Sequence, residues 1–173
     1  MENENTSSKV SSLPLSSESK SLHRQPPTNT EAEQALLGAI LVNNRAHEHV
    51  SDFLRPEHFV DPLHAKIFDV AGKQIERGQE ANPTTLRFYF EHENDFSDLS
   101  NGTYLSRLAS NAITVINARD YGQVIHDLFL RRQLINLGED TINDAYQNEL
   151  ENTAAIQIEA AEQRLYDLAT VGD

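Results

Sequence analysis

The chain has 173 residues, enough for one domain or one domain with an extension. Its formal net charge of −13 argues against a broad phosphate-binding face, because nucleic-acid affinity depends on clustered Lys and Arg. It contains no Cys, which excludes a disulfide framework and a thiolate metal site. The longest apolar run, 35–42, is far shorter than the ~20 residues that span a bilayer, and the N-terminus lacks the pattern of a secretory signal. We therefore expect a cytoplasmic protein without a membrane segment.

Residues 1–27 are expected to form a disordered, Ser-rich tail. Eight serines fall between Ser7 and Ser21, and few apolar side chains accompany them. Such a segment buries too little apolar surface to offset the entropy that ordering would cost.

Residues 28–112 show the pattern of a globular helical bundle. Thr30 and Glu33 have the spacing of a capping box before an apolar run, which predicts a helix that begins at Glu31. Gly78 stands where a helix C-cap glycine belongs, and Asn82-Pro83 reads as an N-cap followed by Pro at the first helical position. No stretch alternates with period two for long enough to indicate a strand. We expect an all-α fold with short helices at 31–42, 46–54, 62–77, from Pro83 onward, and around 104–109.

Residues 113–170 predict a long antiparallel helical hairpin. Apolar residues recur at steps of three and four, which places them on one helical face and is typical of paired helices. The residues in question are Val124, Leu128, Ile135, Ile142 and Ala145, then Ile158, Ala161, Leu165 and Leu168. A single helix over 117–147 would be about 46 Å long at ~1.5 Å per residue, too long for the preceding bundle to cover. A projecting apolar face usually meets another copy or a partner, so we expect an assembly module.

The charge of the hairpin is uneven. From Glu139 to Asp173 there are nine acidic residues and one basic residue, so the net charge there is 1 − 9 = −8. An acidic arm repels DNA and attracts a basic protein surface, although a solvated helix face gives the same pattern more often.

The candidate interface residues lie mostly on this hairpin. Aromatic and aliphatic anchors carry most interface energy, and packing inside the chain is the alternative for each of them. The adjacent Arg131 and Arg132 allow two interpretations: one packs along the apolar face while the other is solvated, or the pair forms a salt bridge between subunits. The full candidate set is Tyr104, Arg131, Arg132, Leu134, Ile135, Ile142 and Tyr146.

The sequence shows no motif typical of catalysis. The chain has no phosphate-cradling loop, no Gly-x-Ser-x-Gly elbow and no Glu-x-x-His pair, so we expect no catalytic, cofactor-binding or metal-binding residue. Asp61 and His64 are the only acidic–histidine pair at that helical spacing. We favour His64 as a partly buried histidine that caps or packs at the start of a helix.

Several segments, taken in order, resemble a known family. They are 31–40 (EAEQALLGAI), 56–59 (PEHF) with His64, Ile67 and Phe68, 102–105 (GTYL), 130–135 (LRRQLI), and Ala161-Glu162 with Leu165. Their order and spacing are similar to the N-terminal domain of the DnaB-type bacterial replicative DNA helicase, over about residues 26–170. Asn101 departs from that pattern, since the family commonly has a first Gly of a pair there.

The resemblance implies a collar of six copies, a trimer of dimers in which hairpins pair between subunits. The collar would bind the C-terminal domain of primase and help admit a helicase loader. ATP and Mg would belong to a separate motor domain, and residues 171–173 fall about where the linker to that motor would begin. This chain would then be no enzyme by itself.

Two alternatives remain open from the sequence. The chain could be a stand-alone truncated relative that regulates a full-length helicase by occupying its hairpin interface. It could also be a small helical metalloprotein that uses several of its seven histidines.

Overall fold

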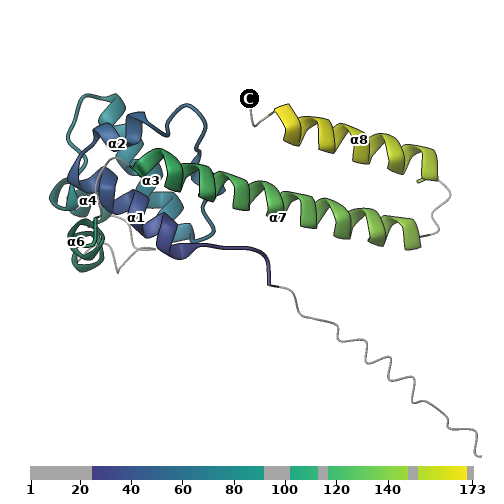
Figure 1. Ribbon diagram of the computed structural model, residues 1–173, viewed down its shortest axis with the longest axis horizontal. Helices are drawn as coiled ribbons and strands as arrows, with labels where there is room; N and C mark the ends of the chain where they lie inside the picture. The colour runs from purple at the N-terminus through teal and green to yellow at the C-terminus, as the bar shows by residue number, and fades with distance from the viewer. Residues whose placement is uncertain (1–24, 92–101, 113–116, 148–151, 171–173) are drawn as a thin grey trace, which may run out of the picture.

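The computed structural model describes residues 25–91, 102–112, 117–147 and 152–170. These residues form short helices followed by two long ones, and no strand occurs within these ranges (Figure 1). The all-α bundle-and-hairpin fold is therefore confirmed. Expectations for the tail up to residue 24 and for the linker at 171–173 lie outside the described residues. The elements are α1 (Thr30–Val42), α2 (Arg45–Glu48), the 3-10 helix η1 (Pro56–His58), α3 (Pro62–Glu76), α4 (Pro83–Phe90), α6 (Thr103–Ser110), α7 (Ala118–Tyr146) and α8 (Ala154–Thr170).

Most helix boundaries follow from local capping chemistry. Asn82 accepts hydrogen bonds from the backbone N–H groups of Thr84 and Thr85 and caps α4, as expected. Gly78 has a φ of +72°, so the glycine that ends α3 adopts the left-handed conformation. The prediction of a capping box formed by Thr30 and Glu33 at the start of α1 was wrong. Asn29 is the N-cap, and the Glu33 side chain turns into the protein instead of back to the helix end.

The second helix is shorter than expected. It ends at Glu48, and residues 49–53 continue as turns. The Arg55 guanidinium donates hydrogen bonds to the carbonyls of Ser51 and Leu54, which satisfies acceptors in these turns. Basic side chains near a helix C-terminus commonly satisfy backbone carbonyls in this way.

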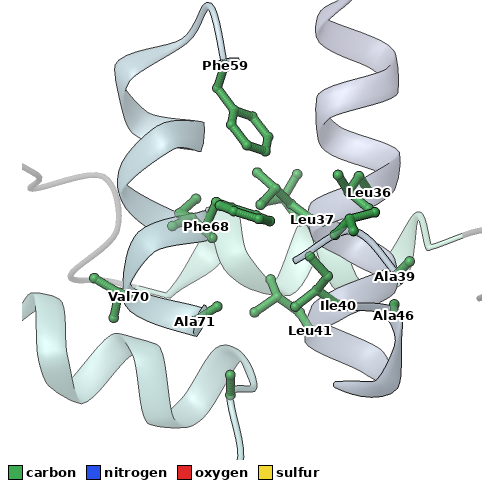
Figure 2. Packing of buried hydrophobic residues seen from close by; sticks show 14 of the residues in the cluster. Leu36, Leu37, Ala39, Ile40, Leu41, Ala46, Phe59, Phe68, Val70 and Ala71 are labelled. Carbon is green, nitrogen blue, oxygen red and sulfur yellow. The ribbon is translucent and has the colours of Figure 1, made fainter. Parts of the chain in front are cut away.

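The core of the bundle surrounds α1. Six consecutive residues of this helix, 36–41, are buried, so its neighbours cover it on more than one side. Leu37, Ile40 and Leu41 point toward Phe68, Val70 and Ala71 of α3 in the view of Figure 2. Helix α4 contributes two buried side chains, Leu86 and Phe90, while Phe88 is exposed.

Two glycines permit close helix packing. A Cβ on Gly38 would collide with the carbonyl oxygen of Leu108, so the absence of a side chain at this position lets α6 approach α1 closely. A Cβ on Gly122 would lie 2.7 Å from Cγ1 of Val50, so α7 also packs tightly against the α2 region. Gly138, by contrast, has open space around it.

Helix α7 is unbroken over its 29 residues, although Gly122 and Gly138 lie within it. Its first half packs on the bundle, and its second half extends well beyond it (Figure 1). Helix α8 runs back along the extended part in the opposite direction, drawn in yellow in Figure 1. The antiparallel hairpin therefore projects from the bundle.

Candidate functional site

A buried polar chain connects α1, α3 and α6 beside the base of the hairpin. The Nδ1–H of His64 donates to the Glu33 carboxylate at 2.6 Å, and His64 Nε2 accepts from the Tyr104 hydroxyl, also at 2.6 Å. The other Glu33 oxygen accepts the backbone N–H of Val60 at 2.7 Å. The prediction that His64 is partly buried was therefore wrong, because its side chain is fully buried.

The hydrogen-bonded residues Glu33, His64 and Tyr104 are of the types found in an acid–base relay, but their geometry is that of a structural network. Both nitrogens of His64 are occupied, and the Tyr104 hydroxyl also accepts a hydrogen bond from Gln34 at 3.3 Å. Buried polar groups that are fully satisfied in this way hold elements in one arrangement. Tyr104, a candidate interface residue, lies half-buried with its hydroxyl bonded inside the chain.

The two neighbouring arginines have different surroundings. The Arg132 guanidinium donates to the carbonyl of His58 at 2.7 Å and to that of Pro27 at 3.1 Å, which ties α7 to the bundle. Arg131 points to solvent and pairs with Asp127 one turn earlier at 2.7 Å. Of these two arginines, only Arg131 therefore presents its charged group to solvent.

An aromatic cluster secures the same stretch of α7. The His58 ring packs at a tilt against the rings of Phe129 and His126, with centroids 4.5 and 4.9 Å away, and His126 meets Phe53 edge-on. Burial, followed by repulsion from His126, lowers the pKa of His58 to about 4, so the ring is neutral near pH 7. The Nε2 atom of His126 is buried and has no hydrogen-bond partner among the described residues.

The contact between α7 and α8 uses few apolar side chains. Leu137 is the buried residue of α7 in the projecting half, and it faces Ala161 together with Thr141. Gln157 donates to the Asp144 carbonyl at 3.0 Å, and Arg164 pairs with Asp140 at 2.8 Å. The two helices thus meet mainly through small and polar residues.

Several large apolar residues of the hairpin are exposed. On α7, Leu134 is 51% exposed, Ile135 39%, Ile142 59% and Tyr146 87%. Ile158 and Leu165 of α8 are exposed as well. Most of the apolar positions that the sequence pattern assigned to paired helices are therefore not covered within this chain. The exceptions are the half-buried Leu128, Ala161 and Leu168.

Other kinds of site receive no support from the described residues. No group of three or more His, Cys, Asp or Glu side chains is arranged to hold a metal ion in the part of the chain that the structure describes. Within the same part, no helix is long and apolar enough to cross a membrane. The exposed hairpin face is the feature that calls for a functional explanation.

Comparison with known proteins agrees with this architecture. Residues 25–127 match the family model for the DnaB-like helicase N-terminal domain. The chain belongs to this family. It is 48% identical over 144 residues to the replicative DNA helicase DnaB of Rickettsia felis, which covers 83% of this chain and 29% of that protein. The chain thus spans about a third of the length of the full-length helicases to which it is similar.

Two solved structures share the fold. A crystal structure of the N-terminal domain of DnaB helicase from Mycobacterium tuberculosis superposes with a TM-score of 0.73 at 27% identity, covering 83% of this chain and 99% of that one. A structure of a DnaB-like replicative helicase, described with its interactions with primase, has a TM-score of 0.66 at 24% identity, covering 83% of this chain and 32% of that one. The hairpin is thus part of a DnaB-type N-terminal domain.

Four of the five segments that carried the DnaB resemblance contribute to these buried contacts. Glu33 comes from the first segment, His58 and His64 from the second, Tyr104 from the third and Arg132 from the fourth, and each contacts another of the set directly or through one backbone group. Sequence reasoning identified neither the His58–His126 contact that secures α7 nor Glu33 as the partner of His64. Residue spacing along one helix carries no signal for partners that lie on other helices.

Proposed function

We propose that this chain is the part of a replicative DNA helicase that joins subunits to one another and binds primase, in the cytoplasm, during DNA replication. The hairpin is the interacting element. Association would produce dimers, or a hexameric collar built as a trimer of dimers, and the same domain would contact a helicase loader.

The observation that carries the proposal is the projecting hairpin with its exposed apolar side chains. Leu134, Ile135, Ile142 and Tyr146 lie on a regular helix and stay in contact with water in the single chain. Large apolar side chains gathered on one element are typical of interaction sites, and aromatic anchors such as Tyr contribute strongly to binding energy.

Partner choice is supported by the charge of the hairpin and by one structural relative. The segment from Glu139 onward is acidic, so it would attract a basic protein surface and repel DNA. The relative described with primase shares the fold of this chain. We therefore propose the C-terminal domain of primase as the partner and no strong direct binding of nucleic acid by this domain.

Unwinding activity is proposed for the whole protein and not for this chain. The chain has no phosphate-cradling loop in its sequence, so ATP and Mg would bind to a motor domain outside these residues. This chain would then contribute assembly and recruitment, and no catalytic step.

Light scattering coupled to size exclusion, over a range of chain concentrations, tests the proposal. The expected result is a dimer or larger species that shifts to a still larger complex when the C-terminal domain of primase is added. A strict monomer that ignores primase at all concentrations would contradict it.

A further inference from the structure

A hollow of about 310 Å³ lies between α2 and α3 on the bundle. Its lining comes from α2, from the turns that lead to η1, and from α3, and none of the residues that the structure describes in α7 and α8 takes part. Leu54, Pro56 and Phe68 give it an apolar wall, while His47 and Ser51 supply polar groups. Apolar walls with a few polar groups are typical of binding pockets.

His47 lines this hollow with its ring nitrogens unpaired. The residue is 7% exposed, and its ring packs at a tilt against Phe68 with the centroids 5.4 Å apart. No hydrogen bond to either ring nitrogen is formed within the part of the chain that the structure describes. Because buried polar groups are normally hydrogen-bonded, this imidazole points to a bonding partner from outside the chain.

Gly72 on α3 makes room for the imidazole. A Cβ at this position would lie 3.0 Å from Nε2 of His47 and 3.6 Å from Cε1, so the ring lies directly against the glycine. A glycine inside a helix otherwise weakens it. The place of the imidazole in the hollow therefore depends on the absence of a side chain at residue 72.

The charges around His47 favour a positively charged ligand. Burial lowers the pKa of His47, so near pH 7 the ring is neutral and one nitrogen can accept a hydrogen bond. The carboxylates of Glu76 and Glu48 act on the same ring, since both raise its pKa in opposition to burial. Glu76 lines the hollow, and it forms no ion pair within the described residues.

The two cations that line the hollow already have partners. Lys73 Nζ pairs with the Asp69 carboxylate at 2.6 Å. The Arg55 guanidinium donates hydrogen bonds to three backbone carbonyls of the preceding turns. Glu76 is therefore the lining charge that is left for a ligand.

We propose that this hollow binds an arginine side chain from a basic segment of a partner protein. Its guanidinium donates to the free nitrogen of His47 and pairs with Glu76, and its face packs on the ring of Phe68. Arginine suits these contacts because its planar fork carries five donors and stacks on aromatic rings. A protein segment is the source because a chain with a net charge of −13 attracts basic protein surfaces.

The inference goes beyond the proposed self-association and primase binding. The hollow and the hairpin share no lining residue among those that the structure describes, so failure of this proposal leaves the assembly role unaffected.

Nuclear magnetic resonance of the full chain during titration with N-acetyl-arginine amide tests the proposal. Saturable shifts are expected at the Gly72 amide and at the His47 ring. The pKa of His47 should fall further on binding, because a nearby cation disfavours the charged imidazolium. N-acetyl-citrulline amide, which has a similar shape and no charge, is the matched control and should give no saturable shift.

Variants of the lining residues provide the second readout. Glu76→Gln should weaken binding about two- to fivefold, the range for one partly exposed ion pair. Glu80→Gln, an exposed change outside the hollow, should leave the affinity unchanged. Gly72→Ala should abolish the saturable shifts while circular dichroism still shows a folded helical chain.

Three results would overturn the proposal. They are a wild-type chain without saturable shifts at these residues, equal binding of the citrulline compound, and an unchanged affinity in the Glu76→Gln variant.

Discussion

The carboxylate of Glu33 on α1 lies 2.6 Å from the ring nitrogen Nδ1 of His64 on α3, and both side chains are buried. The other ring nitrogen of His64 is hydrogen-bonded to the Tyr104 hydroxyl on α6, so these residues connect three helices of the bundle. The arrangement of these three helices therefore depends on side chains far apart in the sequence.

Replacement of Glu33 by Ala should lower the free energy of unfolding by about 2–4 kcal/mol. The change leaves the His64 ring N–H and the Val60 backbone N–H without their acceptor in a buried site, and hydrogen bonds to charged groups are costly to lose. Urea unfolding measures the effect. Glu31→Ala on the exposed side of the same helix is the control and should change stability by less than about 0.5 kcal/mol.

Two glycine-to-alanine changes should have opposite effects on the stability of the fold. Gly38→Ala is expected to destabilise by about 1–3 kcal/mol, because the new methyl group collides with the Leu108 carbonyl and separates α1 from α6. Gly138→Ala, in open space on the projecting half of α7, should stabilise the helix by about 1 kcal/mol. Thermal unfolding followed by circular dichroism reports both, and equal signs would contradict the packing described here.

Acid should weaken the fold through His58. Its pKa is lowered to about 4 in the folded chain, against an ordinary value of 6.5, so the unfolded chain binds more protons between these two pH values. Stability is therefore fully present above about pH 6.5 and falls as the pH decreases toward 4. The slope from this group approaches about 1.4 kcal/mol per pH unit within that window.

The measurement is urea unfolding at a series of pH values. His58→Phe keeps an aromatic ring beside Phe129 and should reduce the slope. It should not abolish the slope, because burial also lowers the pKa of His47. An unchanged slope in the His58 variant would show that this ring does not control the acid sensitivity.

Arg132 and Arg131 should respond differently to substitution by Ala. Loss of the Arg132 guanidinium removes hydrogen bonds to two carbonyl groups at the base of the hairpin, for an expected cost of about 1–3 kcal/mol. Arg131→Ala removes an exposed pair with Asp127 and should cost less than about 0.5 kcal/mol. Chemical denaturation of the two variants compares them directly.

The sequence was sufficient for the parts of the fold that local chemistry determines. Asn82-Pro83 and Gly78 predicted a helix start and a helix end because capping depends on neighbouring residues. The same reasoning failed at Glu33, where a capping-box spacing coincides with a buried side chain whose partner lies 31 residues later. Only the tertiary structure distinguishes these two roles of a glutamate.

In the hairpin, too, the sequence predicted the local structure but not the tertiary contacts. Apolar periodicity predicted the long helix and the set of apolar positions on it, and α7 spans nearly the expected residues. Periodicity does not state which face a neighbour covers. Leu137 and Ala161 meet within the chain, whereas Ile135 and Ile142 remain exposed, because α8 packs through small and polar residues on the other side.

Sedimentation velocity of the wild-type chain beside the variant Ile142→Glu tests the central claim, that the exposed face of α7 joins two copies. We predict a concentration-dependent dimer for the wild type and a monomer for Ile142→Glu, because a buried unpaired carboxylate in the interface is costly. Ile156→Glu, a change of the same kind at an exposed position of α8, should still dimerise. Dimerisation of the Ile142 variant with wild-type affinity, or a wild-type chain that stays monomeric, would contradict the account.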